Sequence, residues 1–161
     1  MLTDTHCHLG SHKFPDVDLG PLVERAHEAG VNRMITLATN LQDIPRNLSI
    51  AEKFPEVHAC VGIHPCDVPG TPDDYLGFLR EFSTHHRVAA IGETGLDYFH
   101  PPPEGWTEKS YHQRQRDFLR QHFILAAETG KNVVIHTRDR KGDASFRDAL
   151  AIYEPFAGDL Q

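Results

Sequence analysis

Short apolar runs alternate with longer segments of helical period along the whole chain. The runs cover residues 34–37, 57–61, 88–91 and 132–135, and Met1-Leu2 opens a further short strand that ends before the loop at Leu9-Gly10-Ser11. Each run is too short and too evenly apolar for a surface helix. Such runs suit parallel strands that are buried on both faces.

The segments between these runs carry the signals of helices. Gly30 follows a stretch of apolar residues at helical spacing and is suited to end a helix. Thr71 and Pro72 precede two acidic residues, a combination typical of a helix start. We therefore expect helices over residues 22–29, 71–82, 113–130 and 143–153.

Strands that alternate with helices at this rhythm predict βα units and a parallel sheet. Five units can be counted, and the pattern fits either a doubly wound sheet or a barrel. The long irregular segment 98–109 contains three consecutive prolines and Trp106. A loop of that length is either a lid or binding loop or a solvated insertion.

Length and composition are those of a globular protein with a single domain over residues 1–161. The 161 residues are 39% hydrophobic, and the formal net charge is −7. This charge argues against nonspecific coating of nucleic acid. No apolar run approaches the length of a membrane span and no signal sequence is evident, so we expect a cytoplasmic protein without membrane contact.

The three cysteines do not form a recognisable framework. Cys7, Cys60 and Cys66 are an odd number and show no CxxC spacing. This usage fits neither a set of disulfides nor a cysteine-rich zinc site. We expect reduced, structural thiols.

Two histidines near the N-terminus, His6 and His8, are separated by one residue. On a strand this spacing points both imidazoles to one face, as two ligands of one metal ion require. Asp4 shares that face. A chance pair is the alternative, because the chain contains twelve histidines.

Potential ligands follow four of the five expected strands. These residues are His6 and His8, then His64, then Glu93 and Asp97, and finally His136 and Arg138. The carboxyl ends of parallel strands meet at one edge of a sheet, where sites form in βα proteins. The sequence therefore predicts a functional site at this edge.

Glu93 is the strongest candidate in this group. A carboxylate between two glycines after an apolar strand is costly to bury unless it is paired or bound to a metal. Its two oxygens could bridge two cations, and His136 would add a nitrogen ligand to the second ion. The alternatives are an exposed acid in a turn and a core histidine.

The roles of the remaining candidates are open. His64 either orients a substrate phosphate or is structural. Asp97 more plausibly fixes a ligand or a loop amide than takes part in chemistry. Arg138 either binds phosphate or pairs with Asp139 or Glu93. We expect the other histidines to be surface or packing residues: His12, His27, His58, His85, His86, His100, His112 and His122.

Four motifs in this order resemble the TatD family of metal-dependent deoxyribonucleases in the amidohydrolase superfamily. They are His-Cys-His, Gly-Ile-His-Pro, Gly-Glu-Thr-Gly-Leu-Asp and Ile-His-Thr-Arg-Asp. The resemblance implies a TIM-type (β/α) barrel with two divalent metal ions, namely zinc, manganese or magnesium. It implies that His6 and His8 hold one ion, that Glu93 bridges, and that His136 holds the second. It also implies catalytic or substrate-near roles for His64, Glu93, Asp97, Arg138 and Gln115.

The chain departs from the family in length. Family members continue through three further strands, which supply another histidine and a late aspartate, whereas a complete barrel needs roughly 250 residues. The expected fold is thus a barrel truncated to about five βα units. Its open edges would expose unpaired backbone, so either another copy of the chain covers them or the chain is a piece of a longer protein.

The resemblance implies a phosphodiesterase that acts on single-stranded DNA or on DNA 3′ ends. Two alternatives are a metal-dependent hydrolase of another ester or amide, and an inactive metal-binding remnant that serves as an interaction module.

Overall fold

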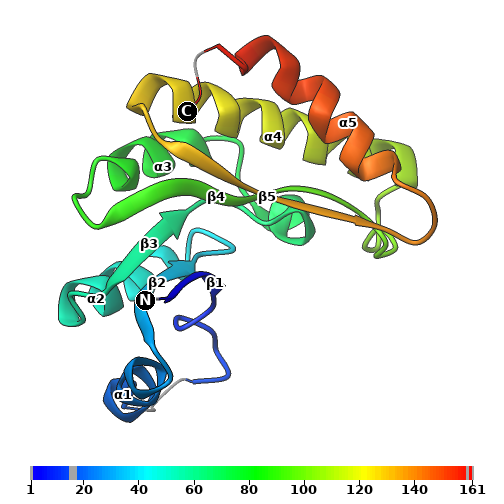
Figure 1. Ribbon diagram of the computed structural model, residues 1–161. Coiled ribbons are helices and arrows are strands. Elements are labelled where there is room, and N and C mark those ends of the chain that lie inside the picture. Colours follow the sequence, from blue (N-terminus) through cyan, green and yellow to red (C-terminus); the bar gives the residue numbers. More distant parts are fainter. Residues whose placement is uncertain (1, 15–17, 159, 161) are drawn as a thin grey trace.

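The structure is a computed structural model that describes residues 2–14, 18–158 and 160. Five parallel strands form one sheet in the order β1-β2-β3-β4-β5. Their bounds are β1 Leu2–Cys7, β2 Val31–Leu37, β3 Val57–Val61, β4 Val88–Tyr98 and β5 Asn132–Asp139. The sheet curls into a half-barrel with helices on its outer side (Figure 1). The prediction of parallel βα units is confirmed, and the sheet takes the barrel-like form.

The helices connect successive strands. Their bounds are α1 Gly20–Glu28, α2 Ile44–Lys53, α3 Tyr75–Ser83, α4 Glu108–Thr129 and α5 Ala144–Tyr153, with short 3₁₀ helices η1 Pro65–Gly70 and η2 Glu154–Phe156. No helix in the described part of the chain has the length and apolar character needed to cross a membrane.

Three helices differ from the predictions. We did not predict α2, whose buried residues include Ile44, Leu48 and Ala51 and which has a proline in its first turn. The predicted start of α3 was wrong, because the helix begins at Tyr75 with no capping hydrogen bond from a side chain. Helix α4 begins at Glu108, before the predicted start at residue 113, because a capping box between Thr107 and Ser110 stabilises its first turn.

Strand β4 is longer than its apolar run. It continues through the Gly-Glu-Thr-Gly-Leu-Asp motif, which we had placed after the strand, and it pairs with β5 from Thr94 to Tyr98. The residues from Ile91 to Asp97 are all buried. The polar side chains of the motif are therefore held by sheet pairing and not by a loop.

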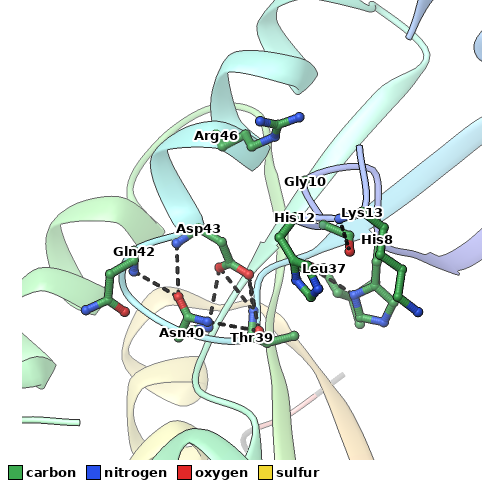
Figure 2. A pocket seen from close by; sticks show the side chains of 11 residues that line it. His8, Gly10, His12, Lys13, Leu37, Thr39, Asn40, Gln42, Asp43 and Arg46 are labelled. Carbon is green, nitrogen blue, oxygen red and sulfur yellow. Dashed lines mark hydrogen bonds between the residues drawn. The ribbon is translucent and has the colours of Figure 1, made fainter. Parts of the chain in front are cut away.

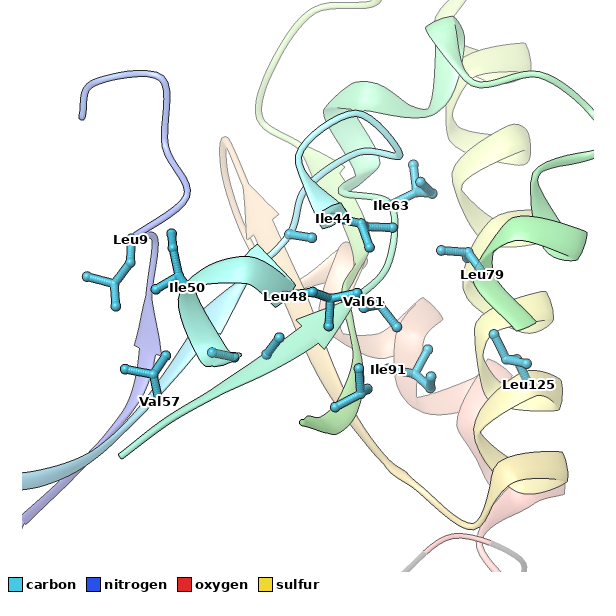
Figure 3. Close-up of a cluster of buried hydrophobic side chains, with 14 of the residues drawn as sticks. Leu9, Ile44, Leu48, Ile50, Val57, Val61, Ile63, Leu79, Ile91 and Leu125 are labelled. Atoms are coloured by element: carbon cyan, nitrogen blue, oxygen red, sulfur yellow. The ribbon is translucent and has the colours of Figure 1, made fainter. Parts of the chain in front are cut away.

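Apolar side chains cover both faces of the inner strands β3 and β4. The residues of the edge strands β1 and β5 are exposed or half-buried, so the prediction of burial on both faces was wrong for these two. Most of the core lies between the outer face and the helices, with Leu48 from α2, Val61 from β3 and Leu125 from α4 (Figure 3). A smaller cluster of Leu37, Cys60 and Ala90 comes from β2, β3 and β4. Burial on two faces explains why the apolar runs of β3 and β4 do not alternate.

Gly95 allows β4 and β5 to approach closely. Its φ is 145°, and a Cβ atom at this position would collide with the carbonyl oxygen of His136. We expect Gly95→Ala to lower the free energy of unfolding by about 1–3 kcal/mol because of backbone strain, and by more if the strands separate. Urea unfolding measures the change.

Gly77→Ala is the matched control for this substitution. Gly77 lies within α3, and an added Cβ would meet nothing within 4 Å. Alanine is favoured over glycine inside a helix, so this variant should be as stable as the wild type or more stable. Equal stability of both variants would contradict the close-approach argument.

The half-barrel has open edges at β1 and β5. Beside β5, Ile135 and Leu150 are exposed and line a shallow apolar cavity of about 180 Å³, together with Phe146 on α5. Exposed strand edges and apolar patches favour association. Coverage of this edge by a second copy of the chain stays a prediction.

We expect self-association through this edge, and Phe146→Glu should shift the chain towards monomer. Phe146 is 58% exposed, so the change buries no charge in the isolated chain. Phe78→Glu on α3, at 49% exposure, is the control and should leave association unchanged. Sedimentation velocity over a range of concentrations makes the measurement, and a monomer at every concentration would contradict the expectation.

Candidate metal centre

The carboxylate of Glu93 lies at the centre of a cluster of imidazoles. Glu93 is only 4% exposed, and its backbone N–H donates to the carbonyl of Ala38 at 3.2 Å. Its Oε2 lies 3.5 Å from Nε2 of His6 and 3.7 Å from Nε2 of His8. The two imidazoles predicted to share a strand face thus meet the same carboxylate oxygen.

The ring of His8 is oriented by a backbone contact. Its Nδ1 lies 3.3 Å from the carbonyl oxygen of Leu37, an acceptor, so Nδ1 carries the proton. Nε2 is then the nitrogen that faces Glu93 and that would bind a metal ion.

The other oxygen of Glu93 faces a second pair of imidazoles. Its Oε1 lies 3.2 Å from Nδ1 of His136, and the same nitrogen lies 3.3 Å from Nε2 of His64. The Nδ1 of His64 accepts a hydrogen bond from the backbone N–H of Cys66 at 3.1 Å. This contact fixes the His64 ring with Nε2 directed into the cluster.

The electrostatics of the cluster favour an ionised Glu93 carboxylate beside a neutral His64. Burial would lower the pKa of His136, but its hydrogen bonds to Glu93 and Asp97 and their charges outweigh it and raise this pKa. Burial would raise the pKa of Glu93, but the hydrogen bond from His136 and the nearby histidines outweigh it and lower this pKa. Burial lowers the pKa of His64 to about 4, and His136 acts in the same direction. At neutral pH His64 is therefore neutral, and because its Nδ1 accepts from Cys66, the single ring proton lies on Nε2.

Asp97 approaches His136 from the other side of the ring. Its Oδ2 lies 3.1 Å from Nε2 of His136, and its carboxylate is fully buried. Burial would raise the pKa of Asp97, but hydrogen bonds from His100 and His136 outweigh it and lower this pKa to about 2. The charged carboxylate thus holds the imidazole in place.

Gln115 differs from the expectation of a substrate-near residue. It is fully buried on α4, where its Oε1 accepts from the backbone N–H of Asp97 at 2.9 Å and its Nε2 donates to the Asp97 carbonyl at 3.3 Å. Gln115 therefore positions the backbone of β4 and does not face the site.

Arg138 lies at the rim of the site. Its guanidinium carbon is 4.1 Å from the centre of the Phe99 ring, a cation–π contact. The alternative partners have other contacts: Asp139 accepts from Ser145 at the start of α5, and Glu93 faces the histidines. Among the described residues, neither carboxylate pairs with Arg138.

A cavity that we did not predict from sequence adjoins His8. It has a volume of about 610 Å³, and Figure 2 shows His12 and Lys13 on the side of His8, with Arg46 on another wall. His12 was expected to be a plain surface residue. The only available signal was the spacing of basic residues just after the His-Cys-His motif.

Asp43, the acidic residue of this cavity, already accepts hydrogen bonds from the backbone. The Asp43 carboxylate accepts from the backbone N–H of Thr39 at 3.1 Å and of Asn40 at 3.3 Å. Because these donors partly offset its charge, the basic residues retain their attraction for an anion in the cavity.

The three thiols are free, as predicted, but they differ in exposure. Cys60 is buried, Cys7 is half-buried and Cys66 is exposed. Among the other histidines, His122 is a packing residue whose Nε2 accepts from the backbone N–H of Ile63 at 3.1 Å. His100 is not a plain surface residue, because its Nδ1 contacts Asp97 at 2.9 Å.

The donor set of the centre fits divalent metal ions. The ligand atoms of His6, His8 and Glu93 lie within 4.8 Å of one another, and so do those of His64, Glu93 and His136. Imidazole nitrogen and carboxylate oxygen are ligands that zinc and manganese share. Glu93 belongs to both groups, and each group offers three potential ligand atoms to one ion.

Comparisons with known proteins identify relatives of this chain. The chain is 34% identical to the metal-dependent hydrolase YabD of Bacillus subtilis over 143 residues, which are 89% of this chain and 53% of YabD. It is 35% identical to the metal-dependent hydrolase TatD of Mycobacterium tuberculosis over 144 residues, 88% of this chain and 53% of that protein. The chain spans about half the length of these relatives.

Solved structures show the same fold. The TatD homologue YjjV from Escherichia coli superposes with a TM-score of 0.77 at 28% identity, over 96% of this chain and 57% of YjjV. A TatD-family hydrolase from Entamoeba histolytica gives a TM-score of 0.79 at 20% identity, over 98% of this chain and 55% of that one. The half-barrel thus corresponds to part of the TatD TIM barrel.

The sequence profile of the family described as TatD related DNase matches residues 3–159. The chain therefore belongs to the TatD family of metal-dependent hydrolases.

Proposed function

We propose that this chain carries the metal-binding part of a TatD-type deoxyribonuclease that cleaves phosphodiester bonds of single-stranded DNA or of DNA 3′ ends in the cytoplasm. The observation that carries the proposal is the position of Glu93. One of its oxygens faces His6 and His8, and the other faces His136.

Two divalent ions would share the Glu93 carboxylate. His6 and His8 would hold one ion, and His136 would hold the other. Divalent ions in such a pair activate water for attack and offset the charge that develops on a phosphoryl group. His64, whose Nδ1 accepts from Cys66, would face this set as a hydrogen-bond donor through Nε2.

The other residues of the chain would orient this set and bind the substrate. Asp97 holds the His136 ring through its contact with Nε2. Lys13 and His12 line the cavity beside His8, and Lys13 supplies positive charge where a DNA backbone would approach. Arg138, at the rim, has the planar fork that binds phosphate oxygens in pairs.

Two other functions would use the same residues differently. A hydrolase of another ester or amide would keep the metal centre but would not require basic residues in the cavity. An inactive remnant would bind metal without turnover. Parallel assays with a phosphodiester, a phosphomonoester, a carboxyl ester and an amide separate these possibilities from the deoxyribonuclease.

We expect Glu93→Gln to abolish metal-dependent cleavage. The amide keeps the shape of the carboxylate but offers only one acceptor oxygen, so it cannot serve both groups of imidazoles. The loss should exceed the ~10- to 100-fold typical of residues that only support metal ligands. The measurement uses metal-stripped protein, restored singly with manganese, magnesium or zinc, and single-stranded DNA labelled at either end.

Glu24→Gln is the matched control, because Glu24 is exposed on α1. It should retain full activity. Cleavage by the Glu93 variant at the wild-type rate would refute the proposed centre. Metal binding by the wild type without cleavage of DNA, with or without hydrolysis of another substrate, would favour one of the alternatives.

We expect Lys13→Ala to raise KM for DNA about 2- to 5-fold with little change in kcat, because an exposed charge pair contributes up to about 1 kcal/mol. The effect should shrink at high salt. Lys53→Ala removes the same charge from the end of α2, away from this cavity, and should leave KM unchanged. Equal effects of the two variants would indicate only a general charge effect.

A further inference from the structure

Three potential metal ligands lie close together beside the candidate centre, one on a strand and two in connections of the half-barrel. They are Cys66 at the start of η1, Asp97 near the end of β4 and His100 in the loop that follows. Sγ of Cys66 lies 3.7 Å from Nδ1 of His100, and this nitrogen lies 2.9 Å from Oδ2 of Asp97. All three ligand atoms are within 4.8 Å of one another. We call them the Cys66 cluster.

The fold presents one oxygen of Asp97 to this cluster. Its Oδ1 accepts hydrogen bonds from the backbone N–H groups of Phe99 at 3.0 Å and His100 at 2.8 Å. Gln115 fixes the backbone of the same residue. The carboxylate is therefore held from two sides, with Oδ2 left to face His100 and His136.

The separations in the cluster match those around a tetrahedral zinc ion. With Zn–S near 2.3 Å and Zn–N or Zn–O near 2.0–2.1 Å, tetrahedral angles give S···N of about 3.6 Å and N···O of about 3.3 Å. The observed separations are 3.7 Å and 2.9 Å. A small widening between Asp97 and His100 would admit the ion.

The chemistry of the donors also selects the ion. Thiolate is a soft ligand that favours zinc over magnesium or manganese, and imidazole and carboxylate complete a borderline set. Cys66 and His100 are both exposed, so an ion has an entry path and a fourth position open to water. The centre around Glu93 contains no sulfur ligand in its two groups, so the two sites differ in preference.

We propose that Cys66, Asp97 and His100 form a separate zinc site, which ties η1 to the loop after β4 at the rim of the half-barrel. The site does not depend on the proposed nuclease activity. Its ion would replace the thiol proton of Cys66 and the proton that Nδ1 of His100 shares with Asp97. Oδ2 of Asp97 also contacts His136, so Asp97 would lie between this ion and the candidate centre.

Cobalt(II) is the probe for this site, because a thiolate bound to it gives a charge-transfer band in the near ultraviolet that nitrogen and oxygen ligands lack. Metal-stripped protein is titrated with cobalt and then with zinc. We expect a thiolate band in the wild type, its loss in Cys66→Ser, and its displacement by zinc. Zinc bound per chain, measured by mass spectrometry, should fall by about one ion in Cys66→Ser and in His100→Ala.

Cys7→Ser is the matched control, because Cys7 lies between His6 and His8 and is half-buried. It should keep the band. A band that disappears in Cys7→Ser but persists in Cys66→Ser would overturn the proposal, and so would the absence of any band from wild-type protein with intact circular dichroism. Glu93→Gln should keep the band while losing cleavage, so failure of the nuclease proposal would leave this test unaffected.

Discussion

The buried carboxylate of Glu93 is the group on which the arrangement of the site depends. A charged side chain at 4% exposure is unfavourable unless it is compensated, and here the imidazoles of His6, His8 and His136 surround it. His6 lies on β1 and His8 directly after it, whereas Glu93 lies on β4 and His136 on the neighbouring strand β5. Pairing of β4 with β5 therefore brings His136 to the charge, and the curvature of the sheet brings His6 and His8.

Much of this arrangement could be predicted from the sequence, because it follows from strand ends. In a parallel sheet all carboxyl ends lie at one edge, so ligands that follow apolar runs meet in space whatever their separation in sequence. His6, His8, Glu93 and His136 were found in this way, and the structure brings them together. Asp97 was also expected to fix another group, and it holds His136.

Most of the parts that were missed depend on contacts that sequence patterns do not report. Helix α2 begins at Ile44 with no capping hydrogen bond from a side chain, but its signals, a proline in the first turn and apolar residues at helical spacing, were overlooked. The extension of β4 through Gly95 requires the close approach of β5, and polar residues in that stretch resemble a turn. Cys66 and His100 belong to different connections, and only the fold places them side by side.

The order of the strands in the sheet is also their order along the chain. Each strand can therefore pair with the one made just before it, and folding can proceed unit by unit as the polypeptide leaves the ribosome. His6 and His8 precede Glu93 and His136 in the chain, but the four side chains meet only after β5 has paired with β4. A nascent chain would thus hold His6 and His8 without these partners until β5 is in place.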